Sequence, residues 1–222
     1  MFEESELSSP FVAKIWRTVS VSAPAFISVA ASHSEIVVAR QNDGRSFVTV
    51  RGPETVATSV PIPPDMEFFG IQFKPGTFIP CLPNDRLADR SITLPELGNG
   101  SFALSSAVME IPTYNNADVF VENLVRKGLL TRDPVIELIL NGEARNLSLR
   151  SIQRRFLRAT GLTHATFRQI ERAQAAADLL DGGLSIFETV HRAGYADQAH
   201  LTRSLRRFLG QTPARIVRER SR

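Results

Sequence analysis

The 222-residue sequence has few residues of the kinds that build covalent or metal chemistry. It contains a single cysteine, Cys81, so no disulfide can form within the chain, and we interpret this residue as a small buried apolar side chain. The histidines form neither an i, i+2 pair nor an HExxH pattern, which argues against a metalloenzyme; they are His33, His164, His191 and His200. His33 and Glu35 could together supply two metal ligands, but a hydrogen-bonded strand histidine is the favoured interpretation.

The sequence also lacks the signatures of common enzymes. It has no GxSxG nucleophile motif, no phosphate-binding loop and no dinucleotide fingerprint. We therefore predict that the chain is not an enzyme and that it carries no metal and no cofactor.

Long apolar runs are missing as well. No stretch approaches the roughly 18 apolar residues that a membrane-spanning helix needs. The first ten residues, MFEESELSSP, are acidic and lack the basic start of a signal peptide, and we expect them to form a loose arm. These features predict a cytoplasmic protein without a membrane partner.

Charge is distributed unevenly along the chain. Residues 141–222 contain 15 arginines and 7 acidic residues, a net charge of +8, whereas residues 1–140 have a net charge of −5. A basic C-terminal part next to a mildly acidic N-terminal part indicates that nucleic acid binds at one end only.

The C-terminal part contains a helix, a tight turn and a second helix between Ser185 and Pro213. Ser185 and Glu188 form a capping box at the start of the first helix, and Gly194 suits a turn of positive φ. Asp197 can cap the second helix. An apolar stripe of Leu201, Leu205 and Phe208 lies opposite a face formed by Ala199, Arg203, Arg206 and Arg207.

A second unit of the same kind lies upstream, from Asp133 to Gly161. Its apolar stripe is Ile152, Phe156 and Ala159, and the opposite face carries Arg150, Arg154 and Arg158 beside Gln153. Between the two units, residues 163–180 have helical spacing. That helix would be about 25 Å long, which suits two reading helices about 34 Å apart on one DNA face.

These residues resemble the AraC/XylS family of bacterial transcription regulators. The resemblance rests on SIQRRFLRATGLTHATFRQIERAQAAADLL and GYADQAHLTRSLRRFLGQTP, and it covers roughly residues 130–217. It implies two helix-turn-helix units joined by a long helix. It also implies DNA contacts from Arg150, Gln153 and Arg154 in the first unit, and from Gln198, Ala199, His200 and Arg203 in the second.

Residues 11–78 are predicted to form strands. Short β-branched or aromatic segments such as EIVVARQ and SFVTVRG are bounded by turn residues, and Asn42-Asp43-Gly44 indicates a hairpin. HSE at residues 33–35, RGPET at 51–55 and GIQFKPGTF at 70–78 resemble the small β-rich sensor domain of some AraC-type regulators. The cupin-like barrels of that family imply an effector pocket, for which the candidate lining residues are Trp16, Phe26, Phe47, Phe69 and Phe73. The alternative is that these aromatic residues belong only to the core.

We expect residues 79–115 to be irregular, with a short helix around Phe102 to Met109, and a helix that Asn116 caps and Gly128 ends. The predicted fold is α+β: an antiparallel β sandwich or cupin-like barrel over residues 1–115, followed by an all-α domain with two helix-turn-helix units over residues 116–222.

The predicted function is that of a sequence-specific transcription regulator that binds double-stranded DNA. A small-molecule effector, a homodimer and a contact with RNA polymerase are left open. Two alternatives are a ligand-binding or catalytic β barrel whose helical tail mediates protein contacts, and a non-specific architectural DNA-binding protein.

Overall fold

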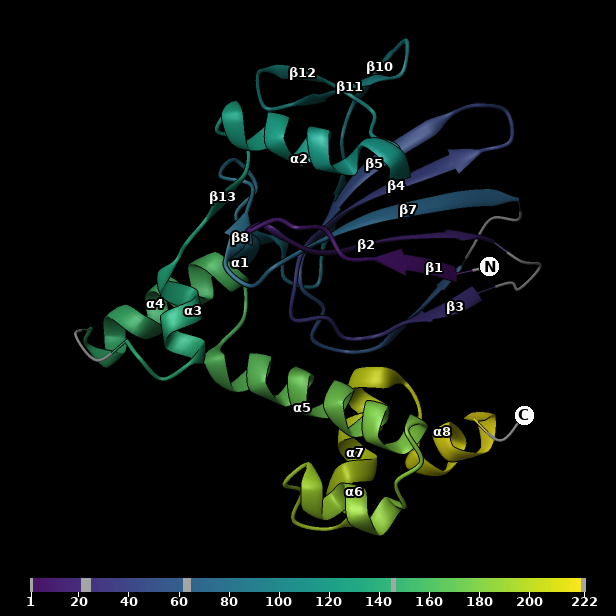
Figure 1. The fold of residues 1–222 in the computed structure, drawn as a ribbon, viewed down its shortest axis with the longest axis vertical. Helices are drawn as coiled ribbons and strands as arrows, with labels where there is room; N and C mark the ends of the chain where they lie inside the picture. Colours follow the sequence, from purple (N-terminus) through teal and green to yellow (C-terminus); the bar gives the residue numbers. More distant parts are fainter. Residues whose placement is uncertain (1, 21–24, 62–64, 145–146, 221–222) are drawn as a thin grey trace. The chain divides into compact units, whose positions relative to one another are not determined.

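The computed structural model describes residues 2–20, 25–61, 65–144 and 147–220, and it has the predicted α+β class (Figure 1). The chain forms two compact units. The first comprises Met1–Pro24, His33–Pro53 and Ile62–Thr163, and the second Ala25–Ser32, Glu54–Pro61 and His164–Arg222. The domain boundary near residue 115 stays a prediction.

The first unit is built around a six-stranded antiparallel sheet. Its strand order is β1 (Phe2–Ser5), β2 (Val12–Val19), β7 (Met66–Phe73), β4 (Glu35–Gln41), β5 (Ser46–Arg51) and β9 (Ser91–Thr93). The predicted hairpin connects β4 and β5, and Gly44 takes a φ of +87° in its turn. Strand β1 corrects the expectation of a loose N-terminal arm, because Phe2 to Ser5 pair with β2 in regular register.

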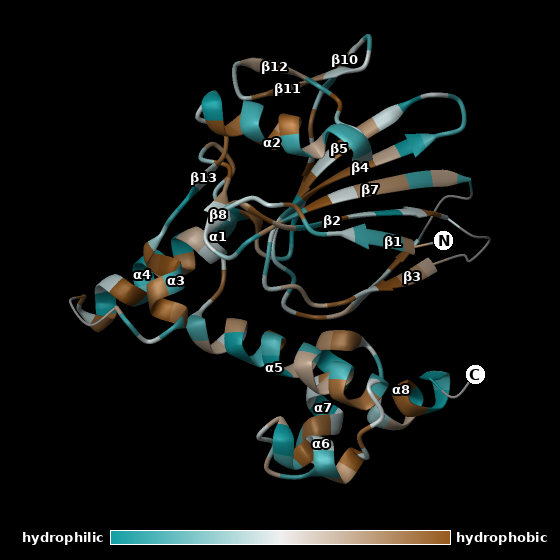
Figure 2. Ribbon diagram, viewed as in Figure 1, coloured by the Kyte–Doolittle hydropathy of each residue, from teal (hydrophilic) through white to brown (hydrophobic). Residues whose placement is uncertain are grey.

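One face of this sheet carries the core of the first unit. Alternate residues along each strand, such as Ile36 and Val38 on β4 and Phe69, Ile71 and Phe73 on β7, are buried on that face. They belong to one hydrophobic cluster with the apolar side of α2 (Ala117–Arg126). The brown strands in Figure 2 mark this apolar composition.

Shorter elements complete this part of the chain. They are β8 (Thr77–Phe78), α1 (Asn84–Leu87), β10 (Glu96–Gly98), β11 (Ser101–Leu104), β12 (Ala107–Glu110), the 3-10 turn η1 (Tyr114–Asn116) and β13 (Thr131–Arg132).

Two expectations for residues 79–115 are wrong. Residues 102–109 form the β11–β12 hairpin instead of a short helix, because Phe102, Leu104 and Met109 point into the core with the period of a strand. Cys81 is exposed, not buried.

Two helices of the first unit belong to the predicted upstream motif. They are α3 (Val135–Leu140) and α4 (Leu149–Thr160), and they pack against each other. The second unit contains α5 (His164–Asp181), α6 (Ile186–Arg192), α7 (Gln198–Leu209) and α8 (Pro213–Arg220). It also contains a two-stranded antiparallel ribbon of β3 (Ala25–Ser28) and β6 (Thr58–Pro61).

Candidate nucleic-acid interface

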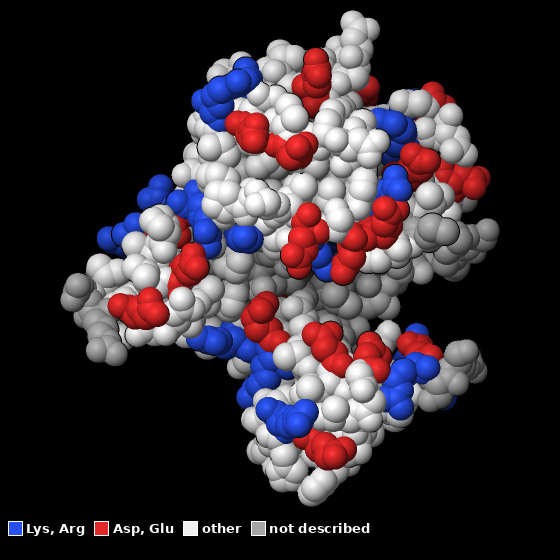
Figure 3. Space-filling model, in the orientation of Figure 1, with Lys and Arg blue, Asp and Glu red and all other residues white. Residues whose placement is uncertain are grey.

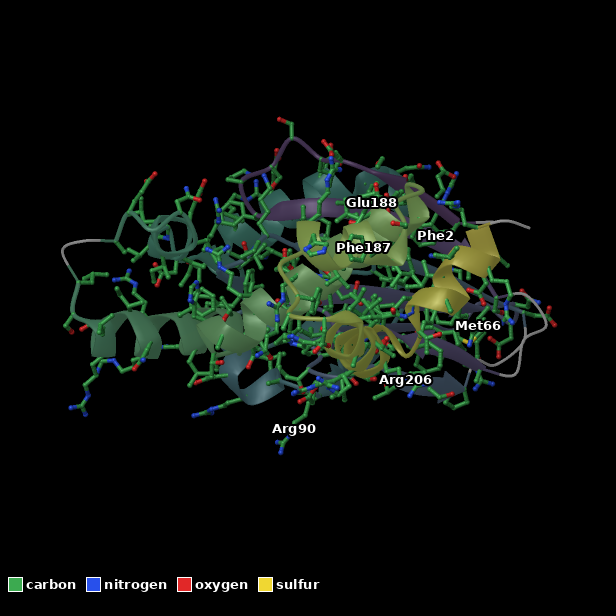
Figure 4. The ribbon with its side chains drawn as sticks, turned by 90° about the horizontal axis from the view of Figure 1, so that it is seen from below. Phe2, Met66, Arg90, Phe187, Glu188 and Arg206 are labelled. Atoms are coloured by element: carbon green, nitrogen blue, oxygen red, sulfur yellow. The ribbon has the colours of Figure 1, made fainter. Side chains whose placement is uncertain are left out.

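Helix α7 has one buried side and one exposed polar side. Asp197 accepts a hydrogen bond from the His200 amide at 2.6 Å, which caps the helix start as predicted, and Gly210 ends it with a φ of +68°. Leu201, Leu205 and Phe208 are buried. The exposed side carries Gln198, Ala199, Arg203, Arg206 and Arg207, and Figure 4 shows Arg206 on this helix.

His200 differs from the other predicted contact residues of α7. Its side chain is half-buried, and its ring meets the edge of Tyr195 at a centroid distance of 5.1 Å. Tyr195 is the anchor of the turn before α7. Its hydroxyl lies 2.9 Å from the Ser204 hydroxyl, and the Arg172 guanidinium stacks 4.5 Å from the centre of its ring. These contacts hold the turn to both α5 and α7.

Helix α6 begins with the predicted capping box. The Ser185 hydroxyl accepts from the Glu188 amide at 3.2 Å, and the Glu188 carboxylate accepts from the Ser185 amide at 3.0 Å. The hydrogen bond from the Ser185 hydroxyl lowers the pKa of the Glu188 carboxyl. Phe187 on this helix is 73% exposed, with its ring against His191 (Figure 4).

Helix α4 in the first unit repeats the pattern of α7. Ser148 caps it by accepting from the Ser151 amide at 3.2 Å, and Gly161 ends it in the left-handed conformation. Phe156 and Ala159 are buried. The exposed side carries the four predicted contact residues Arg150, Gln153, Arg154 and Arg158.

The buried side of α4 is tied to neighbouring elements by polar contacts. The Asn84 side-chain amide, itself buried, donates to the Ala159 carbonyl at 2.8 Å and to the Thr77 carbonyl at 3.2 Å. The Arg155 guanidinium donates to the Asp133 carboxylate at 2.5 Å, and this hydrogen bond raises the pKa of Arg155. Arg155 is therefore paired within the fold, although its side chain, like that of Arg154, is exposed.

The structure thus gathers the predicted contact residues into two exposed helix faces. One is the α4 face (Arg150, Gln153, Arg154 and Arg158) and the other is the α7 face (Gln198, Ala199, Arg203, Arg206 and Arg207). Leu149, which no sequence motif marks, is 78% exposed at the first position of α4. Acidic and basic side chains both occur on the face of the second unit that Figure 3 shows, so charge alone does not delimit an interface there.

A cavity of about 510 Å³ lies in the first unit, at the end of the sheet where β2 finishes and β7 begins. Val38 and Phe69 contribute apolar lining, and the Arg17 guanidinium stacks 4.6 Å from the centre of the Tyr114 ring. Arg40 also lines the cavity, and its guanidinium donates to the Ser46 hydroxyl at 3.4 Å.

Of the five aromatic residues predicted for an effector pocket, Phe69 lines this cavity. Phe73 is part of the hydrophobic core, at 1% exposed. Phe47 is 37% exposed on the opposite side of the sheet, and Phe26 belongs to the second unit, where it is 42% exposed. Trp16 lies across Gly70 on the sheet face opposite the core, so close that a side chain at residue 70 would collide with its indole.

Several polar and charged side chains lie near Trp16 on that face. The Glu35 carboxylate accepts from the Trp16 indole at 3.1 Å and from Arg51 at 3.1 Å. Burial, followed by the positive charges of Lys14 and Arg51, lowers the pKa of the nearby His33 from 6.5 to about 4. His33 is therefore neutral at pH 7. Among the residues that the structure describes, no three His, Cys, Asp or Glu side chains are grouped to hold a metal ion.

The helical region of the chain is similar in sequence to known proteins. A family model described as a helix-turn-helix domain matches residues 143–219. The C-terminal part of this chain therefore contains a helix-turn-helix domain. The matched residues contain α4 to α8, so this domain includes both exposed helix faces.

Two curated relatives match the same part of the chain. The HTH-type transcriptional regulator RipA of Corynebacterium glutamicum is 38% identical over 72 residues, which are 32% of this chain and 22% of the relative. RipA of Corynebacterium diphtheriae is 32% identical over 87 residues, 39% of this chain and 25% of the relative. The match therefore spans about a quarter of the length of these regulators.

Among solved structures, ToxT from Vibrio cholerae aligns over 97% of both chains with a TM-score of 0.43 and 11% sequence identity. Within the described residues, none of the helices combines the length and the apolar character needed to cross a bilayer.

Proposed function

We propose that this protein is a sequence-specific DNA-binding transcription regulator. The observation that supports it best is α7, a helix capped at both ends whose exposed side carries Gln198, Arg203 and Arg206 within the helix-turn-helix domain. A helix of this kind fits the major groove, where Arg recognises guanine and Gln recognises adenine through paired hydrogen bonds. The curated relatives that share this domain are transcription regulators rather than enzymes.

The exposed residues divide into two proposed roles. Residues in the first two turns of a reading helix reach base edges, and later ones reach the phosphates. We assign base contacts to Arg150, Gln153, Arg154, Gln198 and Arg203, and phosphate contacts to Arg158, Arg206 and Arg207. Ala199 can pack against a thymine methyl group. His200 is braced against Tyr195, so its proposed DNA contact comes from the exposed part of its ring.

The assignment is tested by comparing Arg203→Ala with Arg207→Ala. A lost bidentate base contact costs about 1 to 3 kcal/mol on the specific site but leaves random DNA unaffected. Arg203→Ala should therefore weaken binding to a selected operator far more than binding to random DNA, whereas Arg207→Ala should weaken both alike. Fluorescence anisotropy titrations on the two DNAs measure this contrast, and equal losses for the two variants would refute the roles.

A non-specific architectural role makes a different prediction. Selection from random DNA would then yield no preferred sequence, whereas a regulator with two reading helices selects a two-part motif. A protein-contact role for the helical region predicts no shift of any DNA, with or without effectors. The selection experiment distinguishes all three functions.

We also propose that a small-molecule effector binds in the cavity lined by Val38, Arg40, Phe69 and Tyr114. Its volume of about 510 Å³ suits a small ligand, and its apolar lining next to two guanidinium groups suits an apolar molecule with an anionic group. Glu3 and Glu67 also line it, so the two positive charges are partly balanced.

The dye 8-anilinonaphthalene-1-sulfonate has this chemistry and can probe the cavity. Its fluorescence should rise with the wild-type protein and much less with Arg40→Glu, because the reversed charge repels the sulfonate. Arg45→Glu, on the exposed β4–β5 turn, is the matched control. An equal rise with all three proteins would place the dye elsewhere. A cytoplasmic location, a homodimer and a contact with RNA polymerase complete the proposal.

A further inference from the structure

The β3–β6 ribbon comes from the N-terminal half of the chain but belongs to the same compact unit as α5 to α8. Its two strands pair over four residues each, from Ala25↔Pro61 to Ser28↔Thr58. A further bridge, Ala31↔Glu54, extends the pairing. The ribbon is therefore a regular two-stranded element.

The ribbon supplies hydrogen-bond donors to the last turn of α7. The Ala30 amide donates to the Phe208 carbonyl at 2.7 Å, and the Ala57 amide donates to the Arg207 carbonyl at 2.8 Å. Carbonyl groups in the last turn of a helix have no partner within the helix. The residues that follow β3 and precede β6 thus cap the end of α7.

The ribbon is also bound to α5. The Ser32 hydroxyl donates to the Glu171 carboxylate at 2.5 Å, and the Gln174 side chain donates to the Ala30 carbonyl at 2.9 Å. Ala30 therefore contacts α7 through its amide and α5 through its carbonyl. The ribbon connects the two helices at one point of the unit.

Packing at Gly210 shows how close this contact is. Gly210 ends α7 with a φ of +68°, and a Cβ atom there would lie 2.9 Å from Ile27 Cγ2 and 3.4 Å from Ala57 Cβ. Ile27 would have to move to admit even a methyl group, and Ala57 would lie in van der Waals contact with it. The end of α7 and the ribbon are thus in direct van der Waals contact.

We propose that the β3–β6 ribbon is a positioning element for DNA recognition: it holds the end of α7 against α5, and the base discrimination of α7 depends on it. This inference rests on the proposed function, in which α7 reads DNA. It extends that function to residues outside the helix-turn-helix domain, because the ribbon lies far upstream of residue 143.

Chain order places the ribbon between strands of the six-stranded sheet. Strand β3 follows β2 and β6 precedes β7, so both strands of the ribbon continue from strands of the six-stranded sheet. Val19, at the end of β2, and Glu67, near the start of β7, line the cavity of the first unit.

Two glycines with the same backbone conformation provide a matched test. Gly210 and Gly194 both have a φ of +68°, so an alanine at either position meets the same backbone strain. A Cβ at Gly194 meets nothing within 4 Å, whereas one at Gly210 presses on the ribbon. In the full-length protein, Gly210→Ala should weaken binding to the selected operator by on the order of tenfold relative to Gly194→Ala, the size of one lost base contact.

Amide hydrogen exchange tests the contact between the ribbon and α7 in the absence of DNA. The Ala30 and Ala57 amides should exchange slowly in the wild-type protein and in Gly194→Ala, and faster in Gly210→Ala. Fast exchange of these amides in the wild-type protein overturns the proposal. The double variant Ser32→Ala/Gln174→Ala, which loosens the ribbon from α5 without backbone strain, replaces Gly210→Ala if that chain does not fold.

A double-mutant cycle separates positioning from general destabilisation. In the Gly210→Ala background, Arg203→Ala on α7 should lose much of its effect on operator affinity, while Arg154→Ala on α4 should keep its full effect. Additive effects for both arginines overturn the positioning role even when the amides are protected. A wild-type protein that binds no DNA, with the amides still protected, overturns the proposed function and leaves the ribbon contact in place.

Discussion

His33 is the titratable residue that the fold perturbs most clearly. Burial disfavours its charged form, and Lys14 and Arg51 add to the effect, so its pKa falls from 6.5 to about 4. It lies in the bend just before β4, not in a strand as expected, close to Lys14 and to the Arg51–Glu35 ion pair. The nearby Trp16, the single tryptophan of the chain, provides a spectroscopic reporter for this region.

We predict that His33 makes stability depend on pH between about 6.5 and 4. In this range His33 is protonated in the unfolded chain but still neutral in the folded chain. The free energy of unfolding therefore falls as the pH falls, by up to about 3 kcal/mol, and it levels off below pH 4. Urea unfolding followed by Trp16 fluorescence at pH 7 and pH 4.5 measures the loss. His33→Gln should show a smaller loss, and His191→Gln, changed at an exposed histidine, should behave like the wild type. Identical pH dependence in all three proteins would show that His33 is not responsible.

Some single residues could not be placed from the sequence. Alternation along a strand assigns side chains to two faces, but it does not say which face a later helix will cover. Trp16 and Phe69 both looked like pocket residues, yet one lies over Gly70 outside the core and the other lines the cavity. Cys81 is exposed because its segment bends between short elements, which composition does not reveal.

At the scale of elements, local chemistry was a reliable guide. The capping residues Ser185 and Asp197 and the ends at Gly194 and Gly210 were predicted because each depends only on neighbouring residues. The β11–β12 hairpin was missed because its alternation is short. The contact of the ribbon with α7 could not be predicted either, since it joins residues 150 and 178 positions apart and is made by backbone amides that carry no sequence signature.

Asn84 provides a prediction about how α4 is held. Its buried side chain donates to carbonyls of Ala159 and Thr77, so Asn84→Ala leaves two buried acceptors without this donor. We expect a loss of about 1 to 3 kcal/mol in the free energy of unfolding, measured by urea titration. Asn123→Ala, which removes the acceptor of an exposed hydrogen bond from Arg126 on α2, should cost far less. A similar small loss for both variants would mean that α4 does not depend on this contact.

For the whole molecule, the contrast between a net charge of +8 in residues 141–222 and −5 in residues 1–140 predicts salt-dependent binding confined to the helical end. The logarithm of the binding constant should fall linearly with the logarithm of salt concentration. Arg158→Ala and Arg207→Ala should each reduce the slope by about 1, because each removes one phosphate contact. Arg215→Ala should leave it nearly unchanged, since Arg215 is paired with Glu219 at 2.7 Å. Equal slopes for all three variants would contradict the assigned phosphate contacts.

The Ala30 and Ala57 amides, which donate to the last turn of α7, have a consequence for the design of C-terminal fragments. A fragment cut at the family boundary, residue 143, loses Ala30 and Ala57, so the carbonyls of Phe208 and Arg207 face water and Ile27 no longer covers Gly210. Such a fragment carries every arginine assigned to DNA, yet its last helical turn is free to fray. Weak DNA binding by this fragment would therefore reflect the loss of these contacts and not the affinity of the full-length protein.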